Sequence, residues 1–347
     1  MSALYIALIV LSLIHTTYFV LAVLHPNNRK KKFNKESYSI EHIVCFKNET
    51  KFIEKKLKNC YELSYPDLHH TFVNDNSTDD TLELLEKYKG DNTNLISNDE
   101  DLGKNCSQIR SVRETNSDLI LFTDANVFLE KNALDHIVSA FDEDTGGVCG
   151  NVTVTTDMSH QDMIGKYWET EKIIKEFQSS FGAVIGFDGG FYCVKRDCYN
   201  LTGKNQLSDF ETAFLIFQQG KQTKYVRDAM AVEQEKRTLR SSFMARVRAS
   251  NRVFSSFKRI FRYIKQLRRN IIIHFTFYKL VRYSLVILSV LSLPFIVADM
   301  IAISPFLLLV FAIPPVHRVI FESIALCIGA FLVLTGKEYV TWSNKKA

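Results

Sequence analysis

The sequence lacks paired cysteines and has no large excess of charge of either sign. Its seven cysteines are scattered without any Cys-x-x-Cys spacing, so neither a zinc site nor a disulfide framework is expected, and the thiols should be reduced and mostly buried. The formal net charge is only +5, and the basic residues gather beside apolar segments rather than along one soluble face. This pattern indicates anionic membrane lipid rather than nucleic acid as a partner.

Two common nucleotide-binding loops are also missing. No G-x-G-x-x-G follows the first predicted strand at residues 40–46, which disfavours a dinucleotide dehydrogenase. No G-x-x-x-x-G-K-[ST] is present, which excludes the P-loop ATPases.

Long apolar runs lie at the two ends of the chain. The run Ala3–Leu24 contains only His15 as a group that titrates near neutral pH, and it is long enough to cross a bilayer core of roughly 30 Å. No basic residue precedes the run and no small-x-small site follows it, which favours a membrane anchor (1–27) over a cleaved signal peptide. The basic cluster at 29–32 and Lys35 predicts a plasma (inner) membrane protein whose middle part is cytosolic.

The C-terminal part predicts further membrane contact. Residues 238–279 interleave apolar side chains with many Arg and Lys, a pattern typical of interfacial amphipathic helices. Residues 280–336 are strongly apolar and precede a polar tail at 337–347. The lysines of the tail favour two crossings, whereas His317 and Arg318 favour three, and both alternatives stay open.

The middle of the chain alternates strands with helices. Strands are predicted at 40–46, 68–73, 94–97 and 119–123, with helices between them, which indicates a parallel α/β sheet that binds a nucleotide beyond the carboxyl ends of its strands. Further on we expect strands at 148–154 and 191–195, a helix at 161–178, and a helix at 209–219 that ends at Gly220.

Polar residues gather at three of the predicted strand ends. Asn48 and Glu49 follow the first strand, Asp75 follows the second, and the motif Asp124-Ala125-Asn126 follows the fourth. Asp124 and Asn126 offer hard oxygen ligands suited to Mg²⁺ or Mn²⁺. Asp75 is placed to accept hydrogen bonds from a nucleotide base or ribose.

The order of these motifs resembles the family 2 glycosyltransferases, in the membrane-bound branch that builds polysaccharides and glycolipids. The resemblance covers about residues 40–280 and implies a Rossmann-like GT-A domain at 28–237. The matching motifs are Asn48-Glu49, 73–81, Gly103-Lys104, 122–126, Gly150, 186–196, 208–211, Gly220, 231–233, Arg246-Val247-Arg248 and Asn251-Arg252.

The resemblance implies a role for each matching site residue. Asn48, Glu49, Asp75, Lys104 and Asp124 correspond to donor-nucleotide residues, with Asp75 on the base and Asp124 on the metal. Asp209 corresponds to the catalytic base of a single displacement with inversion, although the same residue would serve as an ordinary helix N-cap.

Four more residues are placed around the diphosphate and the acceptor. Gly189 and Gly190 correspond to a tight turn beside the acceptor pocket. Arg246 and Arg248 fall where the family has basic residues near the diphosphate, and membrane-surface binding is the alternative for them.

The sequence also departs from the family pattern. Asn126 replaces the usual second aspartate, Ser208 stands where an acidic residue is common, and the Gln and Trp of Q-x-x-R-W are missing, which favours single or limited addition over long-chain polymerisation. The expected enzyme takes a UDP-sugar, with a GDP-sugar as the alternative, and a lipid-linked or saccharide acceptor. A catalytically degenerate scaffold that partners another synthase is the rival hypothesis, and the oligomeric state is left open.

Overall fold

The computed structural model describes residues 2–26, 37–155, 161–203, 206–234, 239–304, 306 and 314–339. These residues fall into two compact units. One is an α/β unit within Pro26–Lys236, and the other is a helical unit built from Met1–His25, Arg237–Ile264 and Arg268–Tyr339.

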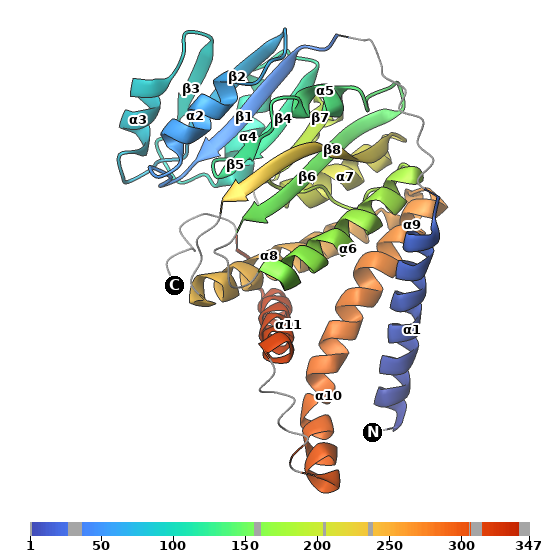
Figure 1. Ribbon diagram of the computed structural model, residues 1–347. Helices are drawn as coiled ribbons and strands as arrows, with labels where there is room; N and C mark the ends of the chain where they lie inside the picture. The colour runs from blue at the N-terminus through green and yellow to red at the C-terminus, as the bar shows by residue number, and fades with distance from the viewer. Residues whose placement is uncertain are drawn as a thin grey trace. The chain divides into compact units, whose positions relative to one another are not determined.

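The described part of the α/β unit contains one eight-stranded sheet in the order β3-β2-β1-β4-β7-β6-β8-β5 (Figure 1). Its strands are β1 Ile40–Phe46, β2 Leu68–Asn74, β3 Thr93–Ser97, β4 Leu119–Asp124, β5 Val127–Leu129, β6 Thr145–Thr155, β7 Phe191–Lys195 and β8 Gln222–Gln234. Strands β1 to β4 pair in parallel as the sequence predicts, whereas β7 runs antiparallel between β4 and β6.

Helices cover both faces of this sheet. They are α2 Ile53–Tyr61, α3 Thr81–Tyr88, α4 Lys104–Arg113, α5 Ala133–Val138, α6 Gln161–Ser180 and α7 Ser208–Gln218. Asn48 takes a left-handed conformation (φ 55°) after β1, and α2 begins only at Ile53. Helices α4 and α5 and strands β5 and β8 were not predicted.

The pleat of the strands assigns side chains to the two faces. On one face, Val44, Phe46 and Phe72 pack with Ile53 and Leu57 of α2 in an apolar cluster. Because neighbouring residues of a strand point to opposite faces, Thr123 shares the α2 face while Asp124 points to the other face. The polar end of β4 is therefore reachable from both sides of the sheet.

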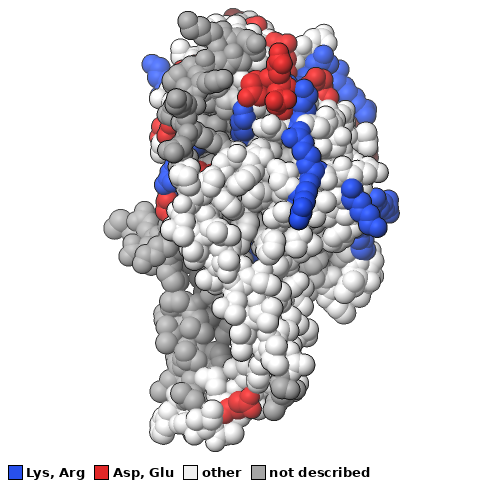
Figure 2. All heavy atoms as spheres, turned by 90° about the vertical axis from the view of Figure 1, so that its right-hand side faces the viewer, with Lys and Arg blue, Asp and Glu red and all other residues white. Residues whose placement is uncertain are grey.

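The helical unit contains long apolar helices. Its elements are α1 Ser2–Leu24, α8 Leu239–Ile260, α9 Arg269–Phe275, a π-helical turn at Thr276–Leu280, α10 Val281–Ile303 and α11 Pro314–Leu334. Among the described residues, the helical stretches Ala3–Leu24 and Arg269–Ile303 are long and apolar enough to cross a membrane. In Figure 2 the lower part of the visible face carries almost no charged side chains apart from a small acidic patch.

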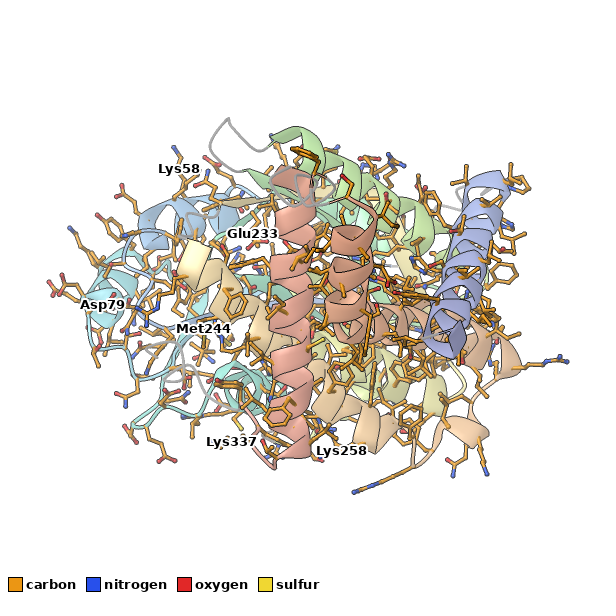
Figure 3. The ribbon with its side chains drawn as sticks, turned by 90° about the horizontal axis from the view of Figure 1, so that it is seen from below. Lys58, Asp79, Glu233, Met244, Lys258 and Lys337 are labelled. Carbon is orange, nitrogen blue, oxygen red and sulfur yellow. The ribbon has the colours of Figure 1, made fainter. Side chains whose placement is uncertain are left out.

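Contacts within the helical unit join its distant segments. The hydroxyl of Tyr18 on α1 forms a hydrogen bond with His274 Nδ1 on α9 at 2.9 Å. Helices α8 and α11 run side by side: Asn251 Nδ2 donates to the carbonyl oxygens of Gly329 (3.3 Å) and Lys337 (2.8 Å), and Lys258 Nζ donates to that of Val333 at 3.3 Å (Figure 3).

Substitution of Gly150 should destabilise the α/β unit. A Cβ at this position would lie 2.2 Å from the Phe191 ring and 2.8 Å from the Ala229 carbonyl oxygen, so β6, β7 and β8 would have to separate. We expect Gly150→Ala to lower the melting temperature, with a loss of about 1–3 kcal/mol in the free energy of unfolding. Gly90→Ala is the matched control, because its Cβ would meet Tyr61 at an ordinary 3.4 Å. Equal thermal unfolding of the two variants would contradict the packing described here.

Candidate functional site

The turn Asp124-Ala125-Asn126 joins β4 to β5 at the carboxyl end of the parallel strands. Asp124 is in register with Cys45 of β1, and its backbone N–H donates to the Gly190 carbonyl oxygen at 3.4 Å. This bond continues the antiparallel pairing of β4 with β7. It brings the loop before β7 directly to the side of Asp124, whose side chain is 36% exposed.

Lys104 connects this turn to the first residue of α4. Its ammonium forms an ion pair with Asp124 Oδ1 and donates to the Gly189 carbonyl oxygen at 3.1 Å. Burial acts to lower the pKa of Lys104, but the carboxylate of Asp124, with a smaller contribution from Asp209, outweighs it and leaves that pKa raised. Lys104 is therefore a firmly charged group between two acidic side chains.

Asp209 lies on the other side of Gly189. It is the second residue of α7, and a Cβ added to Gly189 would lie 2.9 Å from Asp209 Oδ2. Its backbone carbonyl accepts a hydrogen bond from the Phe187 N–H at 2.9 Å, which ties the start of α7 to the same loop. The backbone N–H of Leu207, the residue before α7, donates to Glu211 Oε1 at 3.0 Å. Glu211, rather than Asp209, therefore makes this capping contact at the start of the helix. Asp124, Lys104 and Asp209 thus converge on Gly189.

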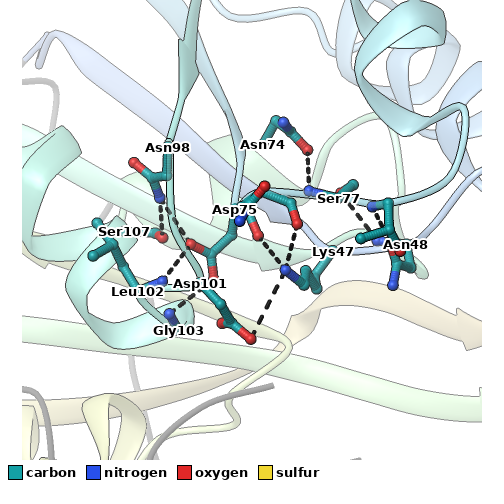
Figure 4. Close-up of polar contacts among 12 residues, drawn as sticks. Lys47, Asn48, Asn74, Asp75, Ser77, Asn98, Asp101, Leu102, Gly103 and Ser107 are labelled. Carbon is teal, nitrogen blue, oxygen red and sulfur yellow. Dashed lines mark hydrogen bonds and ion pairs between the residues drawn. The ribbon is translucent and has the colours of Figure 1, made fainter. Parts of the chain in front are cut away.

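Asp75 belongs to a buried network at the ends of β2 and β3 (Figure 4). Its carboxylate is fully buried and accepts hydrogen bonds from Asn98 Nδ2 at 2.8 Å and from the backbone N–H groups of Leu102 at 3.0 Å and Gly103 at 2.8 Å. Gly103 has φ 81°, a conformation that suits glycine, and directly precedes Lys104. In this structure the hydrogen bonds of Asp75 therefore hold the backbone segment that carries Lys104.

Asn48 and Glu49 join the loops that follow β1 and β2. Asn48 Oδ1 accepts from the Thr78 N–H at 2.8 Å, and the Glu49 N–H donates to Thr81 Oγ1 at 3.0 Å. Lys47 adds hydrogen bonds from Nζ to the carbonyl oxygens of Asp75 and Asn76 (Figure 4). These loops lie at the same sheet edge as Asp75 and Asp124, as the sequence predicts for parallel strands.

The remaining predicted residues make other contacts. Asn126 Nδ2 donates to Glu233 Oε1 at 3.3 Å and to the Gln234 carbonyl oxygen at 3.1 Å, so its amide is oriented by β8. Arg246 and Arg248 belong to α8 of the helical unit. There, Arg246 Nη2 lies 3.9 Å from Glu322 Oε1 of α11. Their contact with a diphosphate stays a prediction.

One functional candidate escaped the sequence analysis. Lys56 of α2 is fully buried, and its Nζ donates to Thr123 Oγ1 at 2.7 Å and to the Val127 carbonyl oxygen at 2.5 Å. In the sequence, Lys56 belongs to the series Ile53, Lys56, Leu57 and Cys60, whose other members form the apolar face of a helix. This position on the apolar face is the sequence feature that indicates a buried lysine.

The donor set of the turn fits a hard divalent cation. Asp124 contributes a carboxylate and Asn126 an amide oxygen, ligand types that Mg²⁺ and Mn²⁺ accept. The ammonium of Lys104 on Asp124 shows that positive charge is stabilised at this position. The arrangement therefore places the carboxylate of Asp124, the ammonium of Lys104 and the carboxylate of Asp209 around Gly189.

Comparisons with known proteins find sequence relatives and a structural neighbour. The model of glycosyl transferase family 2 matches residues 42–200. A poly-beta-1,6-N-acetyl-D-glucosamine synthase of Staphylococcus aureus (strain COL) is 27% identical over 188 residues, which cover 52% of this chain and 45% of that protein. The corresponding synthase of Staphylococcus epidermidis is 22% identical over 203 residues, covering 55% of this chain and 48% of that protein. The chain thus spans about half the length of these relatives.

A solved structure extends the likeness to the whole fold. A mannosyltransferase from Pyrobaculum calidifontis, solved in complex with GDP-Man and Mn²⁺, superposes with a TM-score of 0.72 at 20% identity, covering 96% of this chain and all of that one. The α/β fold predicted from the sequence is confirmed as a GT-A fold, and residues 42–200 match the model of glycosyl transferase family 2.

Proposed function

We propose that this protein is an inverting glycosyltransferase that moves a sugar from a nucleoside diphosphate sugar to a saccharide or lipid-linked acceptor. The convergence of Asp124, Lys104 and Asp209 on Gly189 is the observation that carries the proposal. Sugar transfer needs positive charge for the leaving diphosphate and a base for the acceptor hydroxyl, and these residues supply both.

The donor diphosphate is proposed to lie at the Asp124 turn. Asp124 and the amide oxygen of Asn126 would hold Mg²⁺ or Mn²⁺, which would supply positive charge to the leaving group. The ammonium of Lys104, beside Asp124, would add a second positive charge near the diphosphate. The nucleoside extends over the ends of β1 and β2, near Asn48 and Asp75.

Asp209 is proposed as the base that accepts the proton of the attacking hydroxyl. The N-terminus of α7 favours the ionised carboxylate, because the helix dipole places positive potential there. Gly189 presents no side chain between this carboxylate and Lys104, which leaves room for the acceptor. With one base and no second carboxylate assigned as a nucleophile, the expected outcome is inversion in a single displacement.

A UDP-sugar is the first candidate for the donor. The curated relatives are poly-beta-1,6-N-acetyl-D-glucosamine synthases, which makes N-acetylglucosamine the first sugar to test. GDP-mannose is the second candidate, because the structural neighbour was solved with GDP-Man. The apolar helices of the other unit support a membrane location, and the basic cluster at 29–32 supports a cytosolic active site with a lipid-linked acceptor.

A donor screen separates an active enzyme from the degenerate scaffold. Full-length protein in lipid nanodiscs would be offered UDP- and GDP-sugars, with release of nucleoside diphosphate measured in the presence and absence of Mn²⁺. We expect release from one donor class that depends on the cation. If no donor is turned over and calorimetry detects no nucleotide binding with Mn²⁺, the scaffold hypothesis is favoured.

Asp209→Asn should abolish turnover without abolishing donor binding. The amide retains the size of the side chain at the second position of α7 but cannot take a proton, so kcat should fall by roughly 10²–10⁴-fold. Nucleotide affinity, measured by calorimetry with Mn²⁺, should match the wild type. Asp91→Asn, an exposed change near α3, is the control. Turnover by Asp209→Asn close to that of the control would refute the assignment.

Asp124→Asn should weaken cation binding rather than proton transfer. Loss of the carboxylate removes the charged ligand of the proposed site, so the Mn²⁺ concentration needed for half-maximal turnover should rise at least tenfold, as is usual when a metal ligand shell is weakened. The Mn²⁺ titration of initial rates measures this directly. An unchanged titration curve would show that the cation binds elsewhere.

A further inference from the structure

Lys56 lies beneath the Asp124-Ala125-Asn126 turn, on the opposite face of the sheet from the Asp124 side chain. Its two acceptors, Thr123 Oγ1 at 2.7 Å and the Val127 carbonyl oxygen at 2.5 Å, are the residues immediately before and after the turn. One amine of α2 therefore joins both ends of the turn.

The turn connects two strands that pair with different neighbours in the sheet. Strand β4 pairs with β1 and β7 in the middle of the sheet, whereas β5 pairs with β8 at the far edge. Only Ala125 and Asn126 bridge these two places. The β8 side is held by the two hydrogen bonds of Asn126 Nδ2, and the β4 side is held from below by Lys56.

Burial of a lysine amine costs free energy unless its N–H groups are bonded. Burial lowers the pKa of Lys56, but a neutral amine still has two N–H donors, which match the two acceptors. The clamp therefore works in either protonation state. Replacing the side chain by an apolar one would leave the Val127 carbonyl oxygen without this donor.

The neighbours of Lys56 include a potential metal cluster that we leave unassigned. His42, Cys60 and His70 are buried, and their potential ligand atoms lie within 4.8 Å of one another. His42 Nε2 shares Thr123 Oγ1 with Lys56 at 2.7 Å, so an added cation would lie close to the amine. Burial also lowers the pKa of His70 to about 4, so neutral groups surround the lysine.

We propose that Lys56 is a positioning residue for the cation and diphosphate site, holding the Asp124-Ala125-Asn126 turn through Thr123 and Val127. The inference rests on the proposed function, because it assigns a purpose to the turn only if Asp124 binds the cation. It adds a determinant of metal affinity that touches neither the metal nor the substrate.

The test is Mn²⁺ binding without turnover. Full-length protein in nanodiscs would be titrated with Mn²⁺ in the presence of UDP or GDP, with free Mn²⁺ followed by electron paramagnetic resonance. Lys56→Met and Thr123→Val should weaken Mn²⁺ affinity by roughly 10–100-fold, as is typical when a group that orients a ligand is lost. Thr123→Ser, which keeps the hydroxyl, should bind as the wild type does.

The matched control is Lys58→Met, on the same helix but exposed (Figure 3). In steady-state assays, Lys56→Met should raise the Mn²⁺ requirement far more than it lowers kcat at saturating Mn²⁺. Wild-type Mn²⁺ affinity in Lys56→Met, with only a lower melting temperature, would overturn the inference in favour of a purely structural lysine. Tighter Mn²⁺ binding would overturn it too, because the lysine would then act by charge repulsion.

The design separates this inference from the proposed function. If wild-type protein binds Mn²⁺ with nucleotide and both Lys56→Met and Thr123→Val match it, only the positioning role fails. If the wild type itself binds neither, the proposed function fails and the inference falls with it. Should Lys56→Met not fold, the comparison of Thr123→Val with Thr123→Ser decides the question, since these variants leave the lysine in place.

Discussion

The ion pair between Lys104 and Asp124 is the contact on which the rest of the site depends. Two carboxylates, Asp124 and Asp209, face one glycine and repel each other. The ammonium of Lys104 lies beside both and offsets part of this repulsion, and their negative charge raises the pKa of Lys104 despite its burial. Two carboxylates and one ammonium sum to a formal charge of −1, which would favour a divalent cation beside Asp124.

That contact is assembled from three parts of the chain, each held by backbone hydrogen bonds. Strand β4 carries Asp124, the buried Asp75 carboxylate binds the backbone before Lys104, and the pairing of β4 with β7 positions the Gly189 loop. Lys104 contributes the long side chain of the contact, and its ammonium is held by Asp124 Oδ1 and the Gly189 carbonyl oxygen. A site held by backbone bonds costs little ordering entropy when the substrate arrives.

Much of this could be predicted from the sequence, and the exceptions have physical causes. Strands β1 to β4 are apolar runs with polar residues at their ends, so their parallel order and the motif at Asp124 followed from pattern alone. Helix α4 was missed because its buried face is polar, with Asn105, Ser107 and Gln108 turned inward, and so it shows no apolar stripe. Strand β8 was missed because small and polar residues fill its inward positions and a bulge interrupts its alternation.

The candidate site shows a different limit. Asp209, Asp124 and Asp75 could be chosen by motif. The sequence does not show that the Asp75 carboxylate bonds to the backbone of Leu102 and Gly103, nor that Lys56 is buried, since lysines are almost always at the surface. Both residues act by holding other residues. Their roles depend on which backbone groups surround them, and that information appears only when the chain is folded.

The helices of the C-terminal part are long enough for the predicted crossings. Side chains such as Ile6, Leu13 and Leu24 of α1 are apolar and exposed, as in a helix that faces lipid. The stretch Arg269–Ile303 is long and apolar enough to cross a membrane. Helix α11, Pro314–Leu334, has 21 residues and rises about 31 Å, close to a bilayer core of roughly 30 Å. It packs along the amphipathic α8, with the rings of Phe243 and Phe321 4.6 Å apart and Gly329 against the α8 backbone. The number of C-terminal crossings and the lipid-linked acceptor stay predictions.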